Sequence, residues 1–119
     1  GHVEIGDWSV LGGGVLVHQF TKIGEHSLIG GGFRAVQDVP PYILAADYPL
    51  KFRGVNIIGL KRRGICKEDR RLIKKAYKIF FRSGLNRKIA LEKIKSDLPE
   101  TNVVQNILKF IKQSKRGII

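Results

Sequence analysis

Three histidines and one arginine pair are the side chains of this 119-residue sequence best suited to chemistry on a bound substrate; the histidines are His2, His18 and His26. In the run VHQF, His18 precedes Gln19, so an imidazole and an amide project from adjacent positions and can contact a substrate if the scaffold is rigid. In GLKRRG, Arg62 and Arg63 can hold a diphosphate by bidentate hydrogen bonds. The competing interpretations are surface histidines and a solvated basic loop.

Other kinds of site are disfavoured by the residue spacing. No arrangement of cysteine, histidine and acidic residues resembles a zinc signature, so the sequence predicts no metal site. The glycine triplets at 12–14 and 30–32 lack a following Gly-Lys-Ser/Thr and open no predicted helix, which disfavours a phosphate loop. The single cysteine, Cys66, excludes an internal disulfide and fits a reducing compartment.

The element that must position the first histidines carries an aliphatic residue at every sixth position. The repeat consists of Ile5, Leu11, Val17, Ile23 and Ile29, with Ala35 as a small continuation. A helix repeats near 3.6 residues and a strand near 2, so this spacing predicts a β-solenoid whose inward side chains stack into an apolar column. With three hexads to a coil, the stretch from Val3 to about Asp38 forms roughly two coils.

Glycine follows the aliphatic residue in four of the six hexads, at Gly6, Gly12, Gly24 and Gly30. We expect a tight corner or a close backbone approach at these positions, because glycine has no Cβ. The solenoid therefore occupies residues 1–40. A connecting segment of extended and loop structure, interrupted by prolines, follows at 41–64.

Residues 65–119 change to helical spacing and form the expected C-terminal helical domain. The first helix lies within CKEDRRLIKKAYKIFFRSG and ends near Gly84; a second begins after a cap at Asn86 and ends before Pro99; Thr101 caps a third. One face of the first helix is basic and consists of Arg71, Lys74, Lys75, Lys78 and Arg82.

Charge is divided unequally between the halves of the chain. Residues 1–58 hold 4 Lys and Arg against 5 acidic residues, whereas residues 59–119 hold 18 against 5, a net charge of +13. The second half therefore favours an anionic partner, whether phosphate groups, an acidic protein or nucleic acid. No apolar run reaches the length of a membrane span.

The hexad pattern is already in register at Gly1, which predicts that the chain is the C-terminal part of a longer protein. Two coils alone leave unpaired edges at both ends of the solenoid. The alternative is a stand-alone protein whose missing coils are supplied by oligomerisation.

Several runs in this order resemble one known family. GHV, VHQF, QDVPPY, GVNIIGLKRRG, AYKIFFRSG and the terminal RG are similar to the C-terminal part of the UDP-N-acetylglucosamine O-acyltransferases of lipid A biosynthesis. The resemblance implies a left-handed parallel β-helix followed by a small helical domain, assembled as a cytoplasmic homotrimer. It implies transfer of a 3-hydroxyacyl chain from acyl carrier protein to UDP-N-acetylglucosamine, with no cofactor beyond the phosphopantetheine of the carrier.

The resemblance also implies roles for individual residues. Gly1 matches the oxyanion-hole glycine, and His18 matches an active-site histidine that we count with it as catalytic. His2 and Gln19 match sugar-nucleotide contacts, Asn56 and Arg62 match contacts to the UDP moiety, and Arg63 matches a basic residue at the mouth of the site. The acyl groove corresponds to Val10, Gly13, Leu28 and Gly31, and Gly31 leaves it open for a long chain.

The family's general base lies on a coil upstream of Gly1, so we expect little or no turnover from this chain alone. Ile58 replaces a glutamate found near the uracil in some members, and AADYPLKFRG replaces their usual run before VN. Recognition of the base and of the acceptor amine or hydroxyl is therefore less secure than the acyl-transfer class. The basic helix face could dock acyl carrier protein by charge complementarity.

Two other functions stay open on sequence alone. A non-catalytic module for trimerisation and docking fits the absent general base. A basic three-helix unit could instead bind nucleic acid, with strongly salt-dependent affinity. No base-stacking or base-reading motif is present, and the resemblance implies no nucleic-acid partner. A salt titration against DNA and acyl carrier protein separates the two classes of partner.

Overall fold

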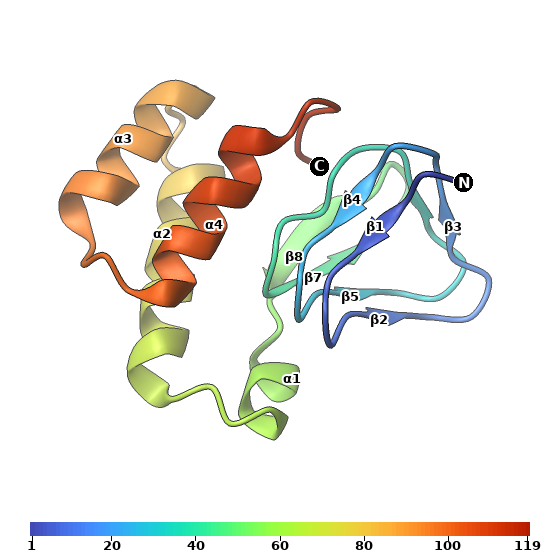
Figure 1. Ribbon diagram of the computed structural model, residues 1–119, viewed down its shortest axis with the longest axis horizontal. Helices are drawn as coiled ribbons and strands as arrows, with labels where there is room; N and C mark the ends of the chain where they lie inside the picture. The colour runs from blue at the N-terminus through green and yellow to red at the C-terminus, as the bar shows by residue number, and fades with distance from the viewer.

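Two stacked triangular coils make up the N-terminal third of the chain in the computed structural model, which describes all 119 residues (Figure 1). The first coil holds β1 (Glu4–Ile5), β2 (Val10–Leu11) and β3 (Leu16–Val17), and the second holds β4 (Lys22–Ile23), β5 (Leu28–Ile29) and β6 (Arg34–Ala35). The pairs β1–β4, β2–β5 and β3–β6 are parallel, and each residue pairs with the one 18 positions later, as Glu4 does with Lys22. The predicted coil of three hexads is confirmed.

One wall of this parallel β-helix is wider than the other two. β7 (Ile43–Ala46) pairs in parallel with β5, and β8 (Lys51–Val55) then pairs antiparallel with β7, which gives the strand order β2-β5-β7-β8. Both β7 and β8 lie within the connecting segment, residues 41–64. Pro40 and Pro41 lie between β6 and β7, where the chain makes no regular ladder.

The inward column is fully formed only in the second coil. Ile23, Ile29 and Ala35 are at most 2% exposed. Ile5, which pairs with Ile23, is 50% exposed because β1 has a neighbouring strand on one side only. The expectation that every hexad aliphatic is buried is therefore wrong for the first coil, where Leu11 and Val17 are also only half-buried, although the register is correct.

The glycines that follow the hexad aliphatic residues are required for stacking and not for turning. A Cβ at Gly6, Gly12 or Gly24 would come within 2.8 Å of backbone atoms of the next coil or of the segment that follows it. The corners come two residues later, so the expected corner at the aliphatic-glycine pair is wrong. At each corner one residue has positive φ, between 55° and 80°; these residues are His2, Trp8, Gly14, Phe20, His26 and Gly32.

Four helices follow the strands: α1 (Ile57–Arg62), α2 (Lys67–Arg82), α3 (Arg87–Asp97) and α4 (Asn102–Gln113). The three predicted helices are confirmed. The side chain of Asn86 accepts a hydrogen bond from the N–H of Ile89, and Gly84 has the positive φ of a helix-ending glycine. The helix α1 was not predicted from the sequence, because six residues are too few to show helical periodicity.

Helices and coils share one hydrophobic core. The buried cluster runs without interruption from Ile23 in the second coil to Ile111 in α4. Two buried polar side chains reinforce this junction. The carboxylate of Asp38, 1% exposed, accepts hydrogen bonds from the Lys22 N–H and the Ser114 hydroxyl, and the Tyr77 hydroxyl donates to the Pro41 carbonyl across 2.5 Å. No helix here is long and apolar enough to cross a membrane.

Tyr77 should make the fold sensitive to alkali. Burial raises the pKa of its phenol well above the ordinary value near 10, and burial also raises the pKa of Tyr42. The stabilisation is present below the pKa of the unfolded chain and is lost as the pH rises above 10, because only the unfolded state then releases the proton. We expect the urea midpoint of Tyr77→Phe to fall less steeply between pH 9 and 11 than that of the parent, as followed by circular dichroism.

Tyr48→Phe is the matched control, since Tyr48 is 80% exposed. Lysines titrate over the same pH range in all three chains and cancel in the comparison. Equal pH slopes for the parent and Tyr77→Phe would contradict the assignment.

Candidate active site

Residues of the four-stranded wall and of α1 line a cavity of about 440 Å³. Five of the residues given a site role from the sequence line it: Val10, Leu28, Asn56, Arg62 and Arg63. Val10 lies in β2 and Leu28 in β5. Asn56 is the N-cap of α1, Arg62 is its last residue, and Arg63 is its C-cap. Stacking of the coils and the return of the chain through β8 therefore bring distant parts of the sequence to one place.

One side of the cavity is an apolar strip. Val10, Leu28 and Leu44 are in register on β2, β5 and β7, so their side chains lie in a row across the outer face of the wall. Val10 is 52% exposed. Leu28 and Leu44 are half-buried. A row of outward-facing aliphatic side chains fits a hydrocarbon chain laid across the strands.

Asn56 holds α1 in place with both polar atoms of its side chain. Its Nδ2 donates to the carbonyl of His26 across 2.9 Å, and its Oδ1 accepts from the N–H of Gly59 at the start of α1. Asn56 is only 6% exposed. Its contacts within the chain therefore position the helix that carries Arg62, in addition to any contact with a ligand.

Two cations lie at the far end of α1. Arg62 is the last residue of the helix and Arg63 its C-cap, and both are exposed. The Arg63 guanidinium carbon lies 3.1 Å from the centroid of the Trp8 ring, which is a cation–π contact between the first coil and α1. The sequence analysis did not single out Trp8.

His26 is a second lining residue that the sequence analysis left without a role. It is 8% exposed, and its ring stacks on that of Tyr42 with centroids 5.8 Å apart. Burial lowers the pKa of His26 below its ordinary value; the charge of Glu25 opposes this shift and that of Arg63 adds to it. The imidazole is accordingly neutral at pH 7.

The sequence contains a signal that points to Trp8 and His26 as site residues. Trp8 and His26 fall in the hexad position that Gly14 and Gly32 occupy on another wall, and this is the left-handed corner. A ring residue costs about 1 kcal/mol or more in that conformation, whereas glycine does not. Ring residues in register with glycines are therefore candidates for function.

The remaining predicted polar residues lie at a different corner of the coil. His2 stacks on Phe20 with ring centroids 5.1 Å apart, and the His18 Nδ1 lies 3.2 Å from the Gln19 carbonyl oxygen. Gly1 directly precedes this group, with nothing within 4 Å of a Cβ built on it. Within one chain the structure does not bring these four residues, Gly1, His2, His18 and Gln19, into the cavity.

The two predicted groove glycines also lie outside the cavity. Gly13 and Gly31 are stacked at the turns that follow β2 and β5, where a Cβ on Gly31 would lie 3.2 Å from the Gly13 carbonyl oxygen. The apolar strip and these glycines lie at opposite ends of the same two strands.

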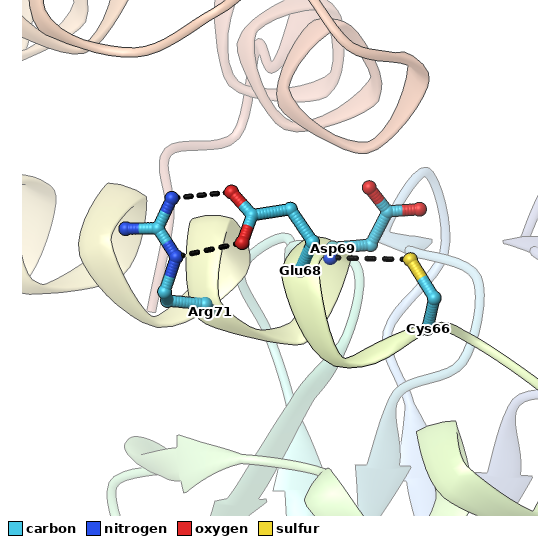
Figure 2. Close-up of polar contacts among 4 residues, drawn as sticks. All are labelled: Cys66, Glu68, Asp69 and Arg71. Carbon is cyan, nitrogen blue, oxygen red and sulfur yellow. Dashed lines mark hydrogen bonds and ion pairs between the residues drawn. The ribbon is translucent and has the colours of Figure 1, made fainter.

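The predicted basic face of α2 is only partly free. Figure 2 shows the start of this helix, where the Arg71 guanidinium pairs with the Glu68 carboxylate and the Cys66 Sγ accepts the Asp69 N–H. By contrast, Lys74, Lys78 and Arg82 form no ion pair within 4 Å and line a hollow of about 380 Å³ beside β8.

Two further hollows contain none of the predicted site residues. One, of about 430 Å³, lies between the β1–β4 wall and α4, and the other, of about 700 Å³, lies between α3 and α4. No three His, Cys, Asp or Glu side chains lie close enough together to hold a metal ion. The cavity beside α1 is thus the one in which predicted cationic, polar and apolar site residues come together.

Comparison with known proteins identifies relatives along the whole chain. A family model described as UDP N-acetylglucosamine O-acyltransferase, domain 2, matches residues 38–119. The acyl-[acyl-carrier-protein]–UDP-N-acetylglucosamine O-acyltransferase of Burkholderia lata is 40% identical over 123 residues, which cover 100% of this chain and 47% of the relative. That of Thiobacillus denitrificans is 40% identical over 119 residues, covering 100% and 46%. The chain spans about half the length of the curated relatives it matches.

Solved structures agree with these matches. A UDP-N-acetylglucosamine acyltransferase from Bacteroides fragilis superposes with a TM-score of 0.96 at 42% identity, covering 98% of this chain and 46% of that one. The enzyme of Francisella novicida gives 0.94 at 39% identity, covering 100% and 44%. The predicted fold class, left-handed parallel β-helix coils followed by a helical domain, is confirmed by this similarity.

Proposed function

The chain belongs to the UDP-N-acetylglucosamine O-acyltransferase family, and on that premise we propose that it holds UDP-N-acetylglucosamine for acylation by a 3-hydroxyacyl group. Acyl carrier protein delivers this group as a thioester, in the first step of lipid A biosynthesis in the cytoplasm. The sugar hydroxyl attacks the thioester carbonyl, a general base takes its proton, and the carrier thiol leaves. No cofactor is needed beyond the phosphopantetheine that arrives with the substrate.

The convergence of charge and apolar surface in one cavity carries this proposal. Arg62 supplies a planar cation with several donors, which suits the diphosphate of a nucleotide sugar. Asn56 fixes the helix that carries it, and Arg63 lies at the rim, where an acidic carrier would approach. The strip of Val10, Leu28 and Leu44 suits an acyl chain leading toward Gly13 and Gly31.

We further propose that the site is completed by a neighbouring copy of the chain in a homotrimer. His2, His18 and Gln19 lie at one corner of the coil, and the cavity lies at another. A three-fold arrangement would set one chain's histidine corner against the next chain's cavity. In that position the Gly1 N–H would stabilise the tetrahedral oxyanion, while His2 and Gln19 would contact the sugar beside His18.

Titration with UDP-N-acetylglucosamine tests the proposal. Trp8 is the only tryptophan and lines the cavity, so its fluorescence reports occupancy. We expect saturable quenching that UDP competes away and that free N-acetylglucosamine, which lacks the diphosphate, does not. Sedimentation equilibrium in the same buffer measures the oligomeric state. An unchanged fluorescence signal together with tight, salt-sensitive DNA binding would overturn the proposal in favour of a nucleic-acid-binding protein.

Addition of 3-hydroxyacyl carrier protein then separates catalysis from binding. Acylated nucleotide sugar would reveal a complete site within this chain. We expect binding with little or no product, because by family resemblance the general base belongs to an upstream coil.

Charge reversal on α2 should weaken the encounter with the carrier. The free cations of its basic face lie beside β8 and α1, and surface charges mainly change the association rate. We expect Lys78→Glu to slow carrier association roughly tenfold at low salt, with the difference shrinking at high salt. Lys95→Glu is the matched control, because Lys95 is also an exposed lysine but lies on α3. Equal association rates for the two variants, measured by stopped flow, would argue against α2 as the docking face.

A further inference from the structure

His26 is held in a fixed orientation beside the cavity. Its backbone N–H donates to the carbonyl of Asp7 across 2.9 Å, and its backbone carbonyl accepts a hydrogen bond from the Asn56 Nδ2 at 2.9 Å. The ring stacks on Tyr42, and Tyr42 is anchored in turn by hydrogen bonds of its hydroxyl with Glu25 and Asn106. The imidazole is therefore positioned from three elements: the β-helix, α1 and α4.

Only one ring nitrogen of His26 can meet a ligand. The Nδ1 atom is buried and has no hydrogen-bond partner. An unpaired buried N–H is rarer in proteins than an unpaired acceptor, so the proton of the neutral ring belongs on Nε2. The tautomer that the surroundings favour thus presents an N–H donor toward the cavity that His26 lines.

Retaining histidine at this position is costly in two respects. The residue has φ 55°, which disfavours a side chain with a Cβ, and it leaves a buried nitrogen unpaired. Glycine at the equivalent corners, Gly14 and Gly32, avoids both costs. Costs of this kind concentrate at functional sites.

We propose that His26 is a further substrate-contacting residue, whose neutral Nε2–H donates a hydrogen bond to an oxygen of the diphosphate held by Arg62. The inference rests on the proposed function, which supplies the ligand. A neutral donor suits this place because a third cation beside two arginines would be repelled, whereas a neutral N–H still stabilises an oxyanion in a partly desolvated cavity.

Three substitutions test where the donor must be. Gln places its amide nitrogen at about the reach of the histidine Nε2, Asn places it at about the reach of Nδ1, and Ala removes it. Titrating each chain with UDP-N-acetylglucosamine, we expect His26→Ala to bind roughly tenfold more weakly, which is the effect of losing one hydrogen bond. We expect His26→Asn to bind as weakly as His26→Ala, and the dissociation constant of His26→Gln to stay within about threefold of that of the parent. Among residues with a Cβ, Asn is one of those that adopt positive φ most readily, so weak binding by His26→Asn cannot come from backbone strain.

Nitrogen-15 NMR of the unsubstituted chain supplies a readout that does not depend on folding of the variants. At pH 7 we expect His26 to be neutral with its proton on Nε2, and the Nε2 signal to shift when the nucleotide sugar binds. A proton on Nδ1, or equal affinity of the parent and His26→Ala, would overturn the inference while leaving the proposed function intact. If the parent itself binds no UDP-N-acetylglucosamine, both fail together.

Discussion

Gly24→Ala will prevent the second coil from packing against the segment that follows it, and the chain will lose most of its stability. A Cβ at this position would lie 2.6 Å from Pro41 Cα and 2.7 Å from the Pro40 carbonyl carbon. These are backbone atoms, and two prolines restrict how far that backbone can shift. Overpacking usually lowers the free energy of unfolding by about 1–3 kcal/mol, and we expect a clash with rigid backbone to lower it by about 3 kcal/mol or more.

The loss should appear as a fall of roughly 10 °C or more in the thermal midpoint, followed by circular dichroism, or as failure to fold. Gly13→Ala is the matched control. It makes the same chemical change in the same coils, but nothing lies within 4 Å of the added Cβ, and the φ of Gly13 isn't in the left-handed region. Equal midpoints for the two variants would show that the coils are not stacked in the register described here.

Arg62→Ala is expected to abolish most of the affinity for UDP-N-acetylglucosamine while leaving the fold intact. The side chain is exposed at the end of α1, so its removal leaves no internal hole. A hydrogen bond to a charged group contributes about 1.5–3 kcal/mol, which corresponds to a loss of roughly 10- to 150-fold in binding. Arg62→Lys should recover only part of this, because an ammonium group cannot form the bidentate contact.

Lys61→Ala provides the comparison for general electrostatics. Lys61 is the adjacent residue of the same helix and carries the same charge, but it does not line the cavity. Its replacement should change the dissociation constant, measured by Trp8 fluorescence, by less than about threefold at physiological salt. If both variants lose affinity equally, the effect of Arg62 is one of net charge, and the cavity is not the diphosphate site.

The strength of the hexad signal explains why so much of the architecture could be predicted. An inward aliphatic residue at Ile5, Leu11 and Val17 recurs 18 residues later at Ile23, Ile29 and Ala35, and this repeat is local information that sets both the coil and its register. The three longer helices likewise carry their own periodicity and end signals, such as Asn86 and Gly84. By contrast, α1 is a single short segment whose start depends on Asn56, and Asn56 is oriented by His26 thirty residues away.

The sequence alone determined the coil, its register, the three longer helices and the basic second half, because each of these follows from spacing and residue type within short windows. The sequence also pointed to Arg62, Asn56 and Val10, although family resemblance and not spacing linked them. Only the tertiary structure decided that these residues share a cavity with Trp8 and His26, while His2 and His18 lie at a different corner of the prism. The physical reason is that the cavity arises where β2, β5 and β7 meet α1, and contacts between residues so far apart in the chain leave no periodic trace in it.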